Sequence, residues 1–414
     1  MKAVEVFTPG KIPTVTFVDD HLKRNEGLLR DALEQGGMLV SLSGPSKSGK
    51  TVFVKTVLGA DYVVAVTGAG IQTSDELWDR VFHVLGTPLP KSVSQADQSG
   101  SKAGGQAKVG GDILVAKAEA SGTIERSTTS TETYTADVAT NRLALLITEL
   151  AGTGITLFID DFHYLGRALQ DEVARQIKDA IASGVQIICA SVPYRSEDVL
   201  RANPDLRGRV VGIDFDYWND DTLQKIGELG FRELNAQPNS DLLRSFASEA
   251  AGSPQLMQAL CLNACFEIGL RERAAKLVSL DDSNELFEAV CTRTSQSANY
   301  AGTLERLRDG PKKRGTDRNQ YRLLGGDVGD VYTILLRAIA LDPPNLHFRY
   351  AELVRRIGRV CENDTPVGSS VTGSCVHVAQ LANDGQERDI IEWDAQEDAL
   401  HIRDPYLLFF MRWG

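Results

Sequence analysis

The loop sequence Gly44-Pro45-Ser46-Lys47-Ser48-Gly49-Lys50-Thr51 constrains the fold of this chain more than any other stretch. An apolar run at 38–42 precedes it and a helix-compatible run at 52–58 follows it. In that context the pattern G-x-x-x-x-G-K-[ST] is typical of a phosphate-binding loop (P-loop) rather than a chance match in a Ser/Gly-rich turn. Backbone N–H groups would point at phosphates, and Gly44 and Gly49 would let the backbone approach without a Cβ. The sequence therefore predicts an α/β fold, a parallel sheet with helices on both faces and a nucleotide at this loop.

The expected cofactors are ATP and Mg²⁺. Lys50 is expected to reach the β- and γ-phosphates, and the Thr51 hydroxyl to hold Mg²⁺. Further along the chain, the apolar run at 155–159 ends in Asp160-Asp161, the arrangement known as Walker B. Because ligands bind at the carboxyl ends of strands in open α/β sheets, Asp160 is expected to hold Mg²⁺ directly or through water. Asp161 is expected to orient or deprotonate the attacking water.

Two later positions are candidate catalytic residues. The buried strand expected at 185–190 ends at Ser191, whose hydroxyl would touch the γ-phosphate or its attacking water. Arg207 and Arg209 precede a late strand at the rim of the module, where an arginine can reach the nucleotide of a neighbouring subunit. We favour Arg209 for this role, with Arg207 next; a solvated rim arginine is the equal alternative.

Hydrophobic periodicity and capping residues predict the other elements of this first region. Strands are expected at 14–18 and 61–66, and helices at 22–33, 143–150 and 171–183. Ser74 is expected to be the N-cap of a further helix that closes at Gly86 and Pro88.

A change of composition sets residues 91–140 apart as an insertion rich in Gly, Ser and Thr. Its first half, through Gly111, is typical of a flexible loop. Its second half alternates small apolar and polar residues, which indicates one arm of a hairpin. Two interpretations stay open: an arm that orders when subunits assemble, and a disordered surface insertion.

Charge and cysteine usage limit the class of protein. The formal net charge of −12 over 414 residues argues against a uniformly basic nucleic-acid coat. No apolar run approaches the length of a membrane span and the amino terminus has no signal-peptide core, so we expect a cytoplasmic protein. The six cysteines show no metal-binding or disulfide spacing, and we expect them to be reduced.

The carboxyl-terminal third is expected to hold a basic linker and a winged helix. Residues 301–326 are predicted to be an exposed basic linker, whose 306–322 stretch would contact nucleic acid or an acidic partner, or simply act as a solvated tether. Residues 327–414 show three helical patterns and two strands, typical of a winged helix. Their eight Lys/Arg against fourteen Asp/Glu make duplex binding unfavourable, so we favour a protein-contact or autoinhibitory role.

The order of these motifs resembles the ATPase module of the AAA+ and STAND groups, especially the archaeal-ATPase and origin-recognition-like branches. Residues Ala251-Gly252-Ser253-Pro254-Gln255 are similar to the G-x-P segment of the lid in those families. The resemblance implies a P-loop core at 1–218, a helical lid at 219–300 and the winged helix at 327–414. The ending 403–413 is similar to the Asp-Pro and aromatic-rich close of archaeal-type ATPases.

The resemblance also implies a function. It suggests a slow ATPase acting as a nucleotide-dependent oligomerising switch, in antiviral defence or signalling, that forms a homo-oligomer and works with an effector or partner protein. Asp161 stands where AAA+ proteins usually have glutamate, and its shorter reach implies slow hydrolysis. Gln255 stands near the position where many AAA+ lids carry the sensor 2 arginine, which favours the STAND-like switch. The alternatives are a DNA-binding ATPase of the origin-recognition type and a nucleotide-gated scaffold using 91–140.

Overall fold

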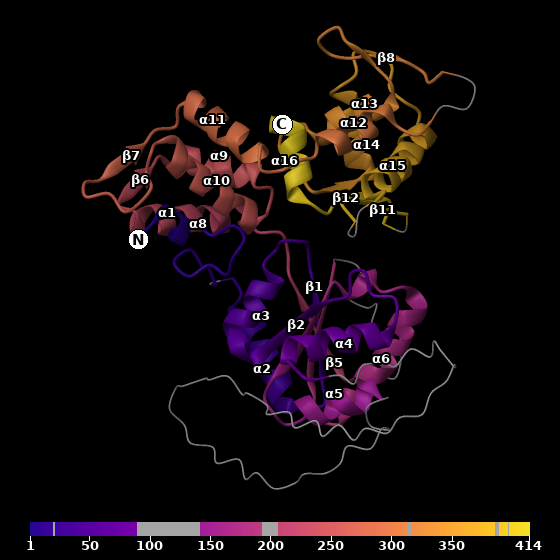
Figure 1. Ribbon diagram of the computed structural model, residues 1–414. Helices are drawn as coiled ribbons and strands as arrows, with labels where there is room; N and C mark the ends of the chain where they lie inside the picture. Colours follow the sequence, from indigo (N-terminus) through magenta and orange to yellow (C-terminus); the bar gives the residue numbers. More distant parts are fainter. Residues whose placement is uncertain (20, 89–140, 193–205, 313–316, 386–388, 396) are drawn as a thin grey trace, which may run out of the picture.

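The computed structural model describes the chain apart from residues 20, 89–140, 193–205, 313–316, 386–388 and 396 (Figure 1). The expected hairpin and loop of the 91–140 insertion therefore lie outside the described residues, as do Lys313 and Arg314 of the basic stretch.

A five-stranded parallel sheet forms the centre of the first domain. Its strands lie in the order β2-β3-β4-β1-β5. Their bounds are β1 Leu39–Ser43, β2 Val63–Thr67, β3 Thr156–Asp160, β4 Gln186–Ser191 and β5 Val210–Asp214. Because all five run the same way, the P-loop after β1, the aspartates after β3 and Ser191 meet at one edge of the sheet.

Helices cover both faces of this sheet, as predicted. Side chains alternate between the faces along each strand: Leu157 and Ile159 pack with one apolar cluster, whereas Phe158 between them packs with the other. One cluster includes α4 Ser74–Leu85, α5 Arg142–Leu150 and α6 Arg167–Ala182, and the other includes α2 Lys23–Gln35 and α3 Lys50–Leu58. The strands are apolar on both sides because both sides are buried.

Two local predictions for this domain are wrong. Residues 14–18, expected as a strand, form a bend and a turn followed by chain without regular secondary structure. The buried Thr16 hydroxyl donates to the Val6 carbonyl and accepts from Gln258 of the lid, so tertiary contacts override the β-branched composition. The N-cap of α4 is Thr73, not Ser74, because the Thr73 side chain accepts from the Glu76 N–H.

The second domain is the helical lid. It consists of α8 Asp220–Glu233, α9 Ser240–Glu249, α10 Pro254–Glu267 and α11 Asn284–Ser295, with a short parallel pair, β6 Ala236–Pro238 and β7 Val278–Leu280. The amino terminus belongs to its core: α1 Ala3–Val6 and Phe7 are buried against it. The first residues of the chain thus pack on the lid, which corrects the expected boundary of the P-loop domain at residue 1.

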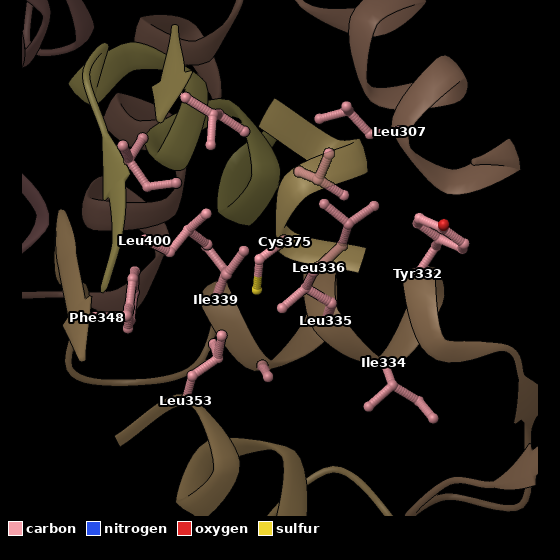
Figure 2. Close-up of a cluster of buried hydrophobic side chains, with 14 of the residues drawn as sticks. Leu307, Tyr332, Ile334, Leu335, Leu336, Ile339, Phe348, Leu353, Cys375 and Leu400 are labelled. Carbon is pink, nitrogen blue, oxygen red and sulfur yellow. The ribbon is translucent and has the colours of Figure 1, made fainter. Parts of the chain in front are cut away.

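The carboxyl-terminal domain packs helices against a three-stranded antiparallel sheet of order β10-β12-β11. Figure 2 shows side chains of its core, with Phe348, Ile339, Leu400 and Cys375 among those labelled. Its elements are α12 Ala301–Asp309, β8 Tyr321–Arg322, β9 Val328–Gly329, α13 Val331–Ile339, β10 His347–Arg349, α14 Tyr350–Gly358, α15 Gly368–Asn383, β11 Ile391–Asp394, β12 Ala399–Ile402 and α16 Pro405–Trp413. The arrangement is compatible with the expected winged helix, with β10 as a strand that the sequence pattern missed.

The beginning of the predicted linker is folded. In α12, Leu304 and Leu307 are buried in the carboxyl-terminal core. Arg318 is also engaged, because it pairs with Asp330 at 2.8 Å and donates to the Asp309 carbonyl. The prediction of an exposed linker is therefore wrong for residues 301–309, where two apolar side chains three positions apart define a buried helix face.

Helix α16 joins the lid to the carboxyl-terminal domain (Figure 1). Phe409 is buried in the lid core, whereas Leu407 and Leu408 are buried in the core of the other domain. Near its end, the Arg412 guanidinium donates to both carboxylate oxygens of Glu249, at 2.9 and 2.6 Å. The two domains are thereby linked by a shared helix and a buried ion pair.

Candidate nucleotide site

Three positions of the P-loop have a positive backbone φ, and two of them are glycines. Gly44 has φ +156°, and a Cβ there would lie 2.5 Å from the Phe215 Cβ, so no side chain fits. Gly49 has φ +98° and is the N-cap of α3. Lys47 adopts a left-handed φ of 61° although it has a side chain. Such strained positions are concentrated at functional sites. Here they lie in the loop that leads into the first residue of α3.

Lys50 lies inside the loop. Its Nζ donates to the Gly44 carbonyl at 2.7 Å and to the Pro45 carbonyl at 2.8 Å, and the residue is 9% exposed. Burial lowers the pKa of Lys50 to about 8, whereas the negative charges of Asp160 and Asp161 favour the charged ammonium. A nearby anion such as a phosphate would favour the charged form further.

The two Walker B aspartates lie beside the loop. The Thr51 hydroxyl donates to the Asp160 carboxylate at 2.8 Å, so the two expected Mg²⁺ ligands are adjacent. Asp161 has φ 57°, and the Thr67 hydroxyl is 3.4 Å from its carboxylate. Hydroxyl and carboxylate oxygens are the donors that Mg²⁺ prefers, together with waters and phosphates, so this pair fits the ion.

Ser191 reaches the site and Arg209 does not. The buried Ser191 lies beside the loop, where its carbonyl accepts from the Gly44 N–H at 3.2 Å. The Arg209 carbonyl instead accepts from Leu39 at the opposite end of β1, one five-residue strand or roughly 16 Å from the P-loop. Arg209 and Arg207 are both exposed there. Arg209 therefore cannot act on the nucleotide of its own chain.

A cavity of about 830 Å³ lies at the P-loop and is also lined by the amino-terminal segment, the lid and the carboxyl-terminal domain. Ligand pockets commonly measure about 300–1,000 Å³, so a nucleotide fits. The lining includes Ser46 and Ser48 of the loop, both aspartates, Ser191, residues 8–13 and 16–18 of the amino-terminal segment, Gln255 and Gln258 of the lid, and Tyr300, Arg403 and Asp404 of the carboxyl-terminal domain. The buried hydroxyls of Thr8 and Ser48 have no hydrogen-bond partner among the described residues, and both residues line this cavity.

Two contacts fasten the carboxyl-terminal domain to the nucleotide site. Lys47 of the P-loop donates to the Asp404 carboxylate at 2.7 Å and lies 4.6 Å from the centre of the Tyr406 ring. Tyr164, just after Walker B, accepts at its hydroxyl from the Asp389 N–H at 2.7 Å. Asp404 is also the N-cap of α16 and accepts from the Tyr300 hydroxyl at 2.8 Å.

Sequence reasoning missed the residues that close the cavity from other domains. Lys47 and Asp404 lie 357 positions apart, and no local pattern relates them. The segment 8–18 was expected to be partly a strand. The sequence feature that includes Arg403 and Asp404 is the Arg-Asp-Pro stretch before the last helix. It indicated a likeness to the carboxyl-terminal end of archaeal-type ATPases and did not indicate a role at the nucleotide site.

Comparisons with known proteins extend these observations. No protein-family model matches the chain, and no curated protein matches its sequence. Among solved structures, a Walker-type ATPase of Pyrococcus abyssi has a TM-score of 0.51 at 15% identity, covering 95% of this chain and 96% of that one. ORC2 of Aeropyrum pernix has a TM-score of 0.48 at 12% identity, covering 98% and 96%. Cdc6p of Pyrobaculum aerophilum has 0.44 at 15%, covering 98% and 96%.

Identities this low show likeness of fold alone. The sheet order, the P-loop geometry and the full-length likeness to the Walker-type ATPase agree with one another. The chain therefore has a P-loop α/β fold like that of this Walker-type ATPase. None of the helices in the described part of the chain has the length and apolarity needed to cross a membrane. All six cysteines are buried and free of disulfides.

Proposed function

We propose that this chain is an ATP-binding, slowly hydrolysing ATPase that acts as a nucleotide-dependent oligomerising switch. The observation that carries the proposal is that one cavity is lined at once by the P-loop, both Walker B aspartates, the lid and the carboxyl-terminal domain. A ligand that contacts several domains favours the arrangement that brings them together, and it shifts that equilibrium only by its differential affinity.

The residues have separate roles in this proposal. The loop from Gly44 to Thr51 binds the phosphates through its backbone N–H groups, and Lys50 places a charge on them. Thr51 and Asp160 hold Mg²⁺, which would neutralise phosphate charge. Asp161 orients or deprotonates the attacking water, and Ser191, which lines the same cavity, orients that water. An aspartate reaches less far than a glutamate, which is consistent with slow hydrolysis.

Replacing Asp161 with Asn should separate hydrolysis from binding. The amide keeps the size of the side chain but cannot take a proton, so we expect hydrolysis to fall about 100-fold. ADP affinity should stay within a factor of two of the wild-type value. Phosphate release and ADP titration measure the two effects, and Asp179→Asn on an exposed turn of α6 is the matched control. Unchanged turnover in Asp161→Asn would remove this residue from the reaction.

Arg209 is proposed to complete the site of a neighbouring subunit. Arg209 is exposed and remote from the cavity of its own chain, so its contribution to turnover should appear only when subunits assemble. We expect Arg209→Ala to lower turnover about 10-fold or more while leaving nucleotide affinity unchanged. Turnover measured against protein concentration tests this, with Arg207→Ala as the companion variant. If Arg209→Ala matches the wild type at every concentration, the residue does not act in trans.

DNA binding of the origin-recognition type is the second candidate. It rests on exposed basic residues of the 306–322 stretch, which include Arg306, Arg308 and Lys312 in the described part of the chain. Where basic side chains neutralise DNA phosphates, the binding affinity falls steeply as the salt concentration rises. Such a salt dependence of DNA binding would distinguish this candidate from the switch. A partner protein that carries effector chemistry is a further proposal.

A further inference from the structure

The wall that the carboxyl-terminal domain contributes to the cavity contains an arginine. Among the described residues that line the cavity, Arg403 is the sole arginine; the other cations there are lysines. It lies between the ends of two contacts already described, Asp404 with Lys47 and Asp389 with Tyr164. Both contacts end on residues of the P-loop domain that flank the phosphate site, so they hold Arg403 close to it.

Arg403 lines the same cavity as Lys50 of the P-loop and Tyr164, which follows the Walker B aspartates. The Arg403 side chain is 10% exposed and forms an ion pair with Glu392 of β11. A guanidinium carries five N–H donors in a planar fork. Arg403 can therefore bind a phosphate while it keeps its ion pair with Glu392.

Electrostatics favours an anion at this position. Arg403 and Lys50 line one cavity, and their two positive charges repel each other. Asp160 and Asp161 compensate in part, but their oxygens are the ones expected to bind Mg²⁺. A terminal phosphate between the P-loop lysine and Arg403 would be attracted by both cations, through charge-assisted hydrogen bonds.

We infer that Arg403 binds the terminal phosphate of ATP from the carboxyl-terminal domain of the same chain, and so couples the γ-phosphate to the position of that domain. The inference rests on the proposed ATP site and adds a phosphate contact within the chain. Arg403 immediately precedes Asp404 and α16, whose side chains enter both the lid and the carboxyl-terminal core. The contact therefore links the terminal phosphate to the junction of three domains.

The test is the ratio of affinities for a non-hydrolysable ATP analogue and for ADP, each with Mg²⁺, by calorimetric titration. We expect Arg403→Ala to weaken analogue binding about 10-fold, the loss of one charge-assisted contact, and to leave ADP binding within a factor of two. Retained ADP binding also shows that the variant is folded. Arg403→Lys keeps the charge and should therefore keep part of the preference for the ATP analogue over ADP. The control is Arg355→Ala, at an exposed position of α14, which should behave as the wild type.

Two results would overturn the inference. If Arg403→Ala keeps the wild-type ratio, or loses affinity for both nucleotides equally, the arginine does not read the terminal phosphate. If the wild-type chain binds neither nucleotide, the proposed function itself fails and the inference with it. These outcomes are distinguishable because the wild-type titration is made first.

Discussion

Replacing Lys50 with Met should weaken nucleotide binding by roughly 30-fold or more while leaving the chain folded. Truncating one partner of a buried charge pair costs about 2–5 kcal/mol, which corresponds to a loss of affinity of roughly 30-fold to several thousand-fold. The folded state should tolerate the change, because burial already lowers the pKa of Lys50 to about 8 and thus disfavours its charge. Met removes the desolvated ammonium and keeps an apolar stem in its place.

Titration with a fluorescent ATP analogue measures the loss, and thermal melting of the same sample reports folding. Lys276→Ala, at an exposed position of the lid, is the control and should bind as the wild type. Wild-type affinity in a folded Lys50→Met variant would contradict the assignment of 44–51 as a phosphate-binding loop.

Removing the Glu249 carboxylate should be the most destabilising single change at the junction between the lid and the carboxyl-terminal domain. Glu249 is 7% exposed and accepts from Arg412 and from the Trp413 indole N–H at 2.8 Å. Glu249→Ala would leave the Arg412 guanidinium, whose side chain is 9% exposed, with only the exposed Asp342 carboxylate as its ionic partner among the described residues. Breaking a buried pair from one side costs about 3–5 kcal/mol, so we expect a loss of about 3 kcal/mol.

The free energy of unfolding from a urea titration tests this expectation. Glu228→Ala, at an exposed position of α8, should change it by about 0.5 kcal/mol or less. Glu249→Gln keeps the shape of the side chain and part of its hydrogen bonding. Its loss of unfolding free energy should lie between those of Glu249→Ala and Glu228→Ala. If Glu249→Ala unfolds like the control, the ion pair does not hold the two domains together.

The nucleotide loop and the parallel sheet were predictable because their signals are local. Gly44 to Thr51 form a contiguous motif with a strand before it and a helix after it, and the apolar run ending at Asp160 is equally contiguous. Parallel strands buried on both faces read as continuous apolar runs, which distinguishes them from the amphipathic helices around them. The helices predicted at 22–33, 143–150 and 171–183 lie close to the observed α2, α5 and α6.

The remainder of the site was not predictable because it is made by long-range packing. Residues 14–18 are β-branched and strand-like in composition, yet Thr16 lies against the lid because Gln258 and the Val6 carbonyl satisfy its hydroxyl. The contact between Lys47 and Asp404 spans 357 positions. Whether a basic stretch is a linker or a buried helix depends on what covers Leu304 and Leu307, which only the three-dimensional structure shows.

The most direct test of the switch is the mass of the purified chain in solution, by light scattering after size-exclusion chromatography. Samples contain no nucleotide, ADP, or a non-hydrolysable ATP analogue with Mg²⁺, each with and without duplex DNA. We predict a shift from monomer to a defined larger assembly with the analogue alone. A shift that requires DNA would favour the DNA-binding candidate, and an unchanged monomer in every sample would contradict the proposal of a nucleotide-dependent oligomerising switch.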